Sequence, residues 1–199
     1  MNTKLEIRTI ATPPSMSEDS TISGYAIVYG VESRVLYDEH GEFVEIIEPG
    51  AVTSKLLARS DVKALFNHGR DNLLARYVNG EGSLSLVSNE VGLRFSFVAP
   101  ATSLGRDVSE LIKRGDLRGC SFAFWAREED CEYSLREDGT RLRRVKKLSM
   151  LSDVSVVVDP AYTQTSVTAR SFEQGDEGEK EKGISVAAAK RCLRILFNE

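Results

Sequence analysis

The sequence predicts a mainly β chain with a few helices (class α+β), whose strands form a closed or half-closed barrel flanked by helices. Two observations indicate this class. Alternating or β-branched apolar segments recur along the chain, and Gly or Asp turn signals separate them. Many short strands of this kind are typical of barrels. The predicted strands are residues 4–10, 21–29, 43–48, 61–68, 73–78, 83–87, 92–98, 120–125, 141–151 and 153–158.

Two helices are expected within this β body. Residues 51–59 follow a Glu-Pro-Gly sequence and predict a short helix. Residues 103–116 predict a longer one, with Ser103 as its N-cap and Gly115 as the residue that ends it. Its apolar residues share one helical face: Leu104, Val108, Leu111 and Ile112.

The domain organisation follows from length and composition. With 199 residues, of which 41% are hydrophobic, the chain can bury one core, and we expect one folded domain over residues 1–170. Residues 171–183 are charged and almost without apolar side chains, as in an exposed linker. Residues 184–199 then predict a short helix that docks on a partner, a tail that is removed, or a frayed terminus.

Composition also argues against several classes of protein. No apolar run reaches the roughly 20 residues of a membrane helix, and the first residues lack the apolar stretch of a signal peptide, so we expect a cytosolic protein without membrane contact. The net charge of −4 argues against nucleic-acid binding. The basic run Arg141–Lys147 predicts a strand with one solvated face in preference to a phosphate-binding stripe.

The three cysteines have irregular spacing and no Cys-x-x-Cys pair. This pattern predicts structural thiols, with neither a disulfide framework nor a zinc site. No metal and no cofactor are therefore expected.

Histidine is the first candidate for chemistry, because the chain has only two. His68 ends the predicted strand 61–68, in the same-face series Val62, Ala64, Phe66, His68, and is followed by Gly69. An imidazole at a strand end can face a cleft, although such a histidine can also be structural. His40 lies in a polar turn and is expected at the surface.

A serine and a cysteine stand together at the start of the strand 120–125. Ser121 follows Gly115 and Gly119, which give the approach backbone freedom and leave backbone N–H groups that can form an oxyanion site. Alternation places Cys120 and Ser121 on opposite faces, so only one of them can face His68. A serine hydroxyl needs a base to act as a nucleophile, and His68 is the candidate.

The third candidate is Asp153, in the strand 153–158. Asp153, Ser155 and Val157 share one face, so a carboxylate lies within a half-buried strand. Burial of a carboxylate is costly unless it is paired. Its partner can be His68, whose tautomer it would fix, or Arg94 or Arg143, and it can also cap a neighbouring turn.

An ordered set of motifs resembles the prohead (capsid maturation) proteases of tailed bacteriophages, a serine peptidase family with a β-barrel similar to that of herpesvirus assemblin proteases. The matching pieces, spread over about residues 22–168, are GYAIVYG, EIIEPGAV, ALFNHGRD, GLRFSFVAP, GDLRGCSFAF and LSDVSVVVDPAY. The resemblance implies a catalytic Ser121, His68 and Asp153, the last at a position where the family commonly has glutamate. Oxyanion donors are expected near Gly119, with Arg118 as a weaker candidate.

The resemblance also implies a substrate, a place and a partner. The substrate is scaffold protein or the scaffolding arm of the major capsid protein, cut inside the assembling procapsid in the host cytoplasm, and the enzyme also cuts itself. A homo-oligomer, dimeric or larger, is implied as well. Two alternatives stay open: a catalytically silent capsid assembly module, and a cysteine hydrolase that uses Cys120.

Overall fold

A computed structural model describes residues 5–158 as two helices, one 3₁₀ turn and three β-sheets. The largest sheet has the strand order β1 (Glu6–Ile10), β11 (Gly119–Trp125), β14 (Met150–Val157), β6 (Asp61–Phe66), β7 (Leu73–Val78), β8 (Glu81–Gly82). The second has the order β2 (Ser15–Met16), β3 (Thr21–Val28), β10 (Gly92–Val98), β9 (Ser85–Ser88). The third has the order β12 (Cys131–Leu135), β13 (Arg141–Val145), β5 (Gly41–Ile47), β4 (Leu36–Asp38).

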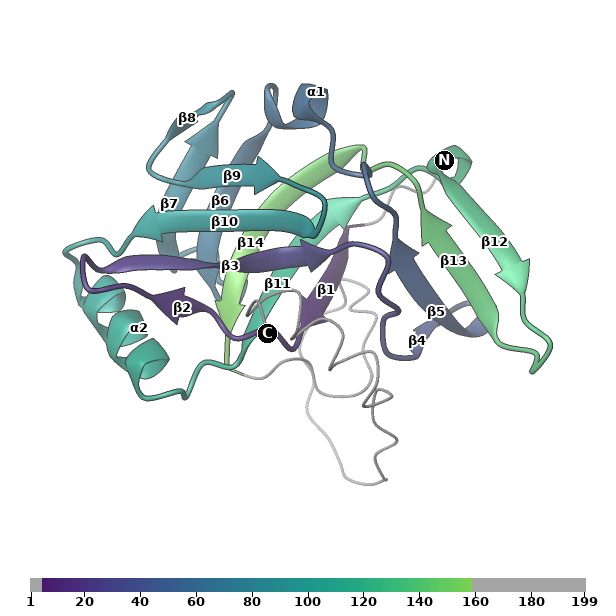
Figure 1. The fold of residues 1–199 in the computed structure, drawn as a ribbon, viewed down its shortest axis with the longest axis horizontal. Coiled ribbons are helices and arrows are strands. Elements are labelled where there is room, and N and C mark those ends of the chain that lie inside the picture. The colour runs from purple at the N-terminus through teal and green to yellow at the C-terminus, as the bar shows by residue number, and fades with distance from the viewer. Residues whose placement is uncertain (1–4, 159–199) are drawn as a thin grey trace.

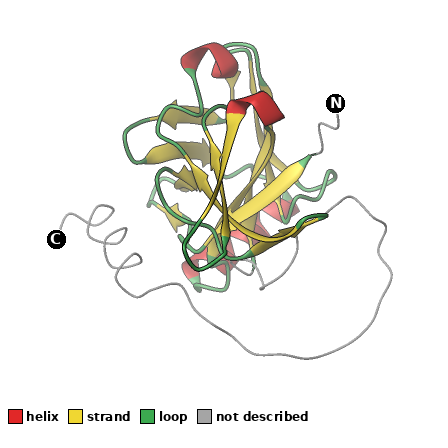
Figure 2. Cartoon of the chain, turned by 90° about the vertical axis from the view of Figure 1, so that its right-hand side faces the viewer, coloured by secondary structure: helices red, strands yellow, loops and turns green. Residues whose placement is uncertain are grey.

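The first two sheets enclose the main core. In Figure 1 the strands β3, β10 and β9 cross in front of β11, β14 and β6, and the third sheet extends to one side. Figure 2 views the chain from the side on which the third sheet lies in Figure 1. Large apolar side chains from both sheets are fully buried between them, including Ile22, Ile27, Phe95, Phe122 and Val154. Their burial is the main stabilising contribution to the fold.

The prediction of a mainly β chain with a few helices is confirmed, whereas the predicted closed or half-closed barrel is not confirmed. The strands form three sheets, each with two ends, and the described residues contain no closed ring of strands. Residues 141–151, which the sequence predicts as a single strand, belong to two strands. Leu148 N donates to Ala51 O and Ser149 N to Trp125 O, so the chain leaves the third sheet after Val145 and enters the first at Met150.

The structure contains four short strands that the sequence does not predict. The strands β2, β4 and β8 have only two or three residues, and none of the four, β12 included, contains a buried residue. Both predicted helices are present, as α1 (Ser54–Leu57) and α2 (Ser103–Lys113). The predicted end of the domain at Arg170, the linker 171–183 and the tail 184–199 lie outside the described residues. Neither helix in the described part of the chain is long and apolar enough to cross a bilayer.

The N-cap of helix α2 lies one residue earlier than the sequence predicts. Thr102, not Ser103, is the N-cap: its backbone is extended and its Oγ1 accepts a hydrogen bond from Gly105 N at 3.1 Å. Gly115 follows the helix with φ +75°, as expected of the residue that ends it. Val108 and Ile112 are buried in the core, as the predicted apolar face requires.

The corrected cap leads to a stability prediction. Thr102→Ala removes the acceptor of Gly105 N and is expected to lower the free energy of unfolding by about 1 kcal/mol. Ser103→Ala is the matched control, because Ser103 is exposed within the first turn and its change is expected to have little effect. Urea denaturation of both variants measures the difference. Equal losses in the two variants would contradict the assignment of the cap.

Strand β1 is attached to the third sheet by a buried ion-pair network of four residues: Glu6, Arg8, Glu45 and Arg143. Arg8 donates to Glu45 Oε1 at 2.7 Å and to Glu6 Oε2 at 2.6 Å, and Arg143 donates to Glu45 Oε2 at 2.9 Å and to Glu6 Oε1 at 2.8 Å. Each glutamate therefore contacts both arginines, and negative and positive charges alternate around the network. Burial raises the pKa of Glu6, but the hydrogen bond from Arg143 and the charges of both arginines outweigh it, so the net pKa is lowered.

The basic run Arg141–Lys147 is largely a structural feature. Its first five residues form β13, and each of its three arginines has an acidic partner. Arg141 pairs with Asp38, Arg143 with Glu6 and Glu45, and Arg144 with Glu48. These ion pairs neutralise the three arginine charges, which a phosphate-binding stripe would have to leave available to a phosphate.

Candidate active site

The central strands of the six-stranded sheet carry the serine and the aspartate. Strands β11 and β14 are antiparallel, with Ser121 opposite Ser155 and Ala123 opposite Asp153. Residues that alternate along a strand share a face, so Ser121, Ser155 and Asp153 project from the same face. The opposite face carries Cys120, which belongs to the core.

A tight turn after β6 brings the histidine to this face. Asn67 and His68 both have left-handed backbones, with φ of 51° and 55°. Such values cost free energy in residues other than glycine and are found where the surrounding structure enforces them, often at active sites. The turn is fastened to β14, because Asn67 N donates to Val156 O at 3.0 Å and Asn67 Oδ1 accepts from Val158 N at 3.1 Å.

This turn corrects one expectation about His68. Simple alternation would place His68 on the face of Val62, Ala64 and Phe66, and the first two of these are buried in the main core. The strand ends at Phe66, however, and the two left-handed residues redirect the chain. His68 therefore reaches the opposite face, where Asp153 and Ser121 lie.

The three side chains form a continuous chain of hydrogen bonds. His68 Nε2 lies 2.6 Å from Ser121 Oγ, and His68 Nδ1 lies 2.6 Å from Asp153 Oδ1. The imidazole is thus held between a hydroxyl and a carboxylate, each on a different ring nitrogen. In this arrangement an imidazole can take a proton from the hydroxyl while the carboxylate stabilises the resulting positive charge.

Strand β1 supplies two further contacts to Ser121. Thr9 lies opposite Ser121 in the ladder, and its hydroxyl donates to Ser121 Oγ at 3.0 Å. Ser121 Oγ also lies 2.8 Å from Arg8 O, so two acceptors, this carbonyl and His68 Nε2, face the single hydroxyl proton. Ser121 is 0% exposed, so a substrate carbonyl reaches Oγ only after a local opening of the site.

The other candidate residues lie elsewhere. The predicted solvated position of His40 is correct, since its side chain is 72% exposed. Arg118 is exposed, and its Nε donates to Gly115 O at 3.2 Å, in the loop that follows α2. Gly119 is the first residue of β11, opposite Val157. Neither Arg118 nor Gly119 has a hydrogen bond to His68 or Ser121 among the contacts of the described residues.

Asp153 pairs with the histidine and with neither of the arginines considered above. Arg94 reaches Ser23 Oγ, while Arg143 belongs to the buried network of β1. Asp153 is 6% exposed, and the predicted half-burial of its strand is an underestimate, because β14 is buried on both faces from Asp153 to Val157. The imidazole and Ser155 cover its polar face.

Cys120 is unsuited to nucleophilic attack. It is 0% exposed and faces the core, where a methyl group added to Gly24 would come within 2.9 Å of its Sγ. Burial raises the pKa of the Cys120 thiol far above its usual range, which suppresses the reactive thiolate. Its place in the core argues against the cysteine hydrolase alternative.

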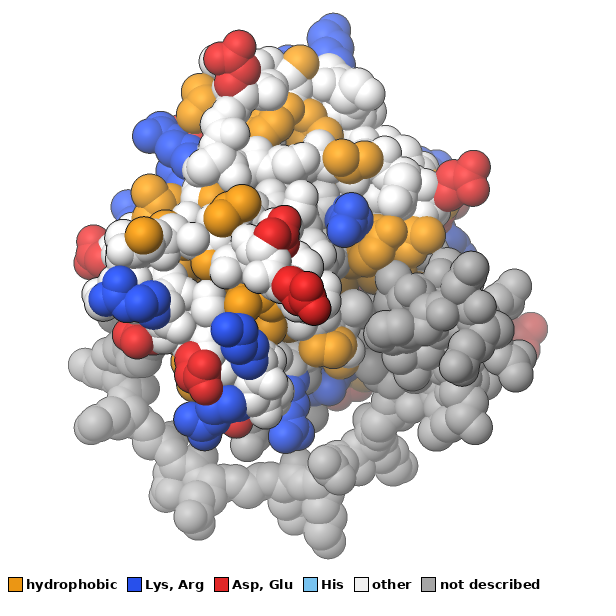
Figure 3. All heavy atoms as spheres, turned by 60° about the vertical axis from the view of Figure 1, so that its left-hand side comes forward, with side chains coloured by type: hydrophobic (Ala, Val, Ile, Leu, Met, Phe, Trp, Pro, Cys, Tyr) orange, Lys and Arg blue, Asp and Glu red, His pale blue; other side chains and the backbone are white. Residues whose placement is uncertain are grey.

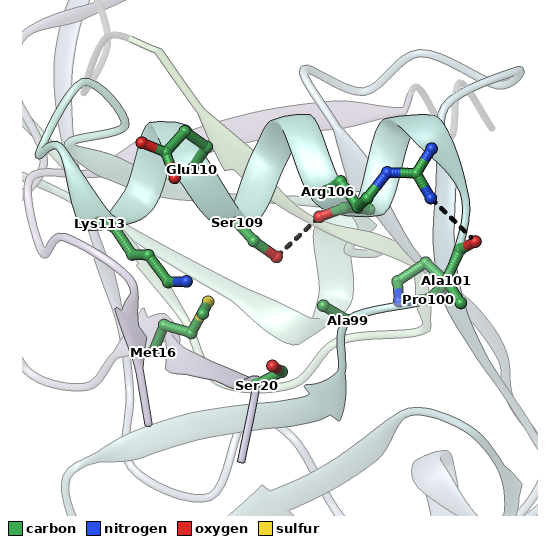
Figure 4. Close-up of a pocket in the computed structure, with 10 residues that line it drawn as sticks. Met16, Ser20, Ala99, Pro100, Ala101, Arg106, Ser109, Glu110 and Lys113 are labelled. Atoms are coloured by element: carbon green, nitrogen blue, oxygen red, sulfur yellow. Dashed lines mark hydrogen bonds between the residues drawn. The ribbon is translucent and has the colours of Figure 1, made fainter. Parts of the chain in front are cut away.

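Two pockets of the described surface are not lined by His68, Ser121 or Asp153. One open pocket of about 430 Å³ lies between α2 and the chain around β2, with Met16, Ser109 and Lys113 among its lining residues (Figure 4). On the face that Figure 3 presents, charged side chains of both signs lie among apolar ones. Within residues 5–158, no group of three or more His, Cys, Asp or Glu side chains is placed to hold a metal ion.

The family model described as caudovirus prohead serine protease matches residues 3–179. The chain belongs to this family. Membership identifies a serine protease of phage capsid maturation, and the resemblance of the sequence to prohead proteases is thereby confirmed. A search of curated proteins finds no match.

One solved structure similar to this prohead protease is the bacteriophage T4 capsid assembly protease, gp21. The two share 12% sequence identity with a TM-score of 0.47, and the alignment covers 78% of this chain and 99% of that one.

Two residues of the candidate site, Ser155 and Thr9, are not among the candidates that the sequence predicts. Ser155 was already placed on the face of Asp153 by alternation, and this was a usable signal, since a second polar side chain on a buried face needs a partner. Thr9 carried no local signal. Its contact with Ser121 depends on the pairing of β1 with β11, which joins residues 112 positions apart.

Proposed function

We propose that this prohead protease cleaves peptide bonds with Ser121 as nucleophile, His68 as general base and Asp153 as the carboxylate that orients the imidazole. The observation that carries the proposal is the continuous hydrogen-bonded series from Ser121 Oγ through both ring nitrogens of His68 to Asp153 Oδ1. Ser121 Oγ attacks the carbonyl carbon as its proton passes to His68 Nε2. The imidazolium then protonates the leaving amine, and water hydrolyses the acyl-enzyme by the same route.

The substrate that we propose is scaffold protein or the scaffolding arm of the major capsid protein. The family supports a role in capsid maturation, and an enzyme with this role would meet such polypeptides inside the assembling procapsid. Cleavage of its own chain and assembly into a homo-oligomer belong to the same proposal. High local concentration inside a shell makes a modest turnover number sufficient.

Co-expression with the cognate capsid protein tests this function. Intact mass spectrometry of the assembled particles is expected to show trimmed capsid protein with the wild-type enzyme and only full-length protein with Ser121→Ala. Cys120→Ala is the matched control, because it alters the neighbouring residue on the opposite face, and it should leave trimming in place.

Each result has one interpretation. Trimming by Ser121→Ala would overturn the assignment of the nucleophile, and loss of trimming in Cys120→Ala alone would revive the cysteine alternative. Full-length capsid protein in the presence of wild-type enzyme would favour a silent assembly module.

A further inference from the structure

Ser155 lies inside the hydrogen-bonded group of the site, although the mechanism above gives it no role. Its Oγ is 3.0 Å from Asp153 Oδ1 and 3.2 Å from His68 Nδ1. Together with the 2.6 Å contact between Nδ1 and Oδ1, these distances close a triangle of three polar atoms. Ser155 is only 1% exposed, so water does not compete for its hydroxyl.

The triangle admits one consistent arrangement of protons. A carboxylate oxygen only accepts, so the contact with Asp153 Oδ1 uses the single proton of Ser155. The lone pairs of Ser155 Oγ then face His68 Nδ1, and this contact is favourable only if Nδ1 carries a proton. With the proton on Nε2 instead, Nδ1 would face two oxygens with no hydrogen between them, which is unfavourable in a buried site.

We propose that Ser155 is a positioning residue that holds the His68 proton on Nδ1 and fixes the carboxylate of Asp153, so that Nε2 is left as the acceptor for Ser121. This inference rests on the proposed function, because it concerns the readiness of the same base. Ser155 touches neither substrate nor the reacting oxygen. It acts through His68 and Asp153 alone.

The strand pairing explains why position 155 can do this. Ser155 stands directly opposite Ser121 in the β11–β14 ladder and two residues after Asp153 on the same face. The turn at His68 places the imidazole over this row. A short side chain is required there, since the hydroxyl must reach both Oδ1 and Nδ1 beneath the ring.

Nitrogen NMR of the two imidazoles provides a test independent of activity. His40 is exposed and serves as an internal reference, and only one other histidine signal is present. In the wild-type enzyme, neutral His68 is expected as a single tautomer with a slowly exchanging Nδ1 proton. In Ser155→Ala we expect a mixture of tautomers and at least a tenfold faster exchange of that proton.

Two further variants sharpen the NMR test. Thr9→Val removes the other hydroxyl of the site, which contacts Ser121 but neither Asp153 nor the imidazole, and its His68 tautomer should match the wild type. Ser155→Cys keeps a side chain at this buried position but donates weakly, and we expect an intermediate tautomer ratio. It also preserves the test if Ser155→Ala fails to fold.

Kinetics supply the second readout. On a peptide that spans the cleavage site found in the co-expression experiment, Ser155→Ala is expected to lower kcat by on the order of tenfold with KM within about twofold, because only the readiness of the base changes. Wild-type tautomer and kcat in Ser155→Ala, with Ser121→Ala inactive, would overturn this inference and leave the proposed function intact. An active Ser121→Ala would overturn the proposed function itself.

Discussion

Asp153→Asn is expected to lower kcat/KM by on the order of 10³–10⁴-fold while the fold is retained. The amide has the size of the carboxylate but lacks its charge, so it no longer stabilises the imidazolium. If the amide nitrogen faces His68 Nδ1, the imidazole proton moves to Nε2, where it points at Ser121 Oγ and prevents proton transfer. Cleavage of the mapped peptide measures the rate, and thermal unfolding followed by circular dichroism checks the fold.

Asp61→Asn is the matched control for this prediction. Asp61 lies at the start of β6, is 39% exposed and pairs with Arg76 at 2.7 Å, outside the site. Loss of its charge should leave the peptide cleavage rate within about twofold of the wild type. Near wild-type turnover in Asp153→Asn would overturn the proposed role of Asp153.

Glu45→Gln is expected to produce a large loss of stability. Glu45 is 2% exposed and accepts hydrogen bonds from both Arg8 and Arg143, so its neutral isostere leaves two buried guanidinium groups short of a counter-charge. Breaking a buried ion pair in this way typically costs about 3–5 kcal/mol. For a domain of this size that corresponds to a decrease in Tm of roughly 6–20 °C.

The same substitution in an exposed pair is the control. Glu132 pairs with Lys146 at the surface, where both side chains are more than half exposed, and Glu132→Gln should change stability by no more than about 1 kcal/mol. Differential scanning calorimetry compares the two variants. Similar values of Tm for both would show that the buried network contributes no more than a surface ion pair.

The sequence predicts the parts of this molecule that depend on local pattern. Buried strands such as β10 and β11 alternate or are continuously apolar, and helix α2 has its apolar face where the spacing of Val108 and Ile112 requires it. Strand β12 is not among the predicted strands, although Cys131, Tyr133 and Leu135 alternate with polar residues, and Tyr133 and Leu135 are exposed. The predicted barrel is not confirmed, because the pairing of strands is decided by contacts between distant residues, which local pattern does not reveal.

In the candidate site, too, local pattern predicts some features, while contacts between distant residues decide the others. Alternation correctly separated Cys120 from Ser121, and it placed Asp153 with Ser155. It failed at His68, where two left-handed residues end the regular period and no sequence rule for strands applies. The contacts of β1 with Ser121, and its ion pairs with β5 and β13, join residues 37 to 137 positions apart and have no local signature.

The complete burial of Ser121 affects how the enzyme should be assayed. Strand β1 packs along β11 with Thr9 against the hydroxyl, so a reagent dissolved in the medium has no direct route to Oγ in this conformation. With Ser121 as the proposed nucleophile, covalent labelling by an activity-based probe would therefore report the number of open molecules and not the total amount of protein. Titration of active sites on the isolated protein would then underestimate the amount of intact protease in a preparation.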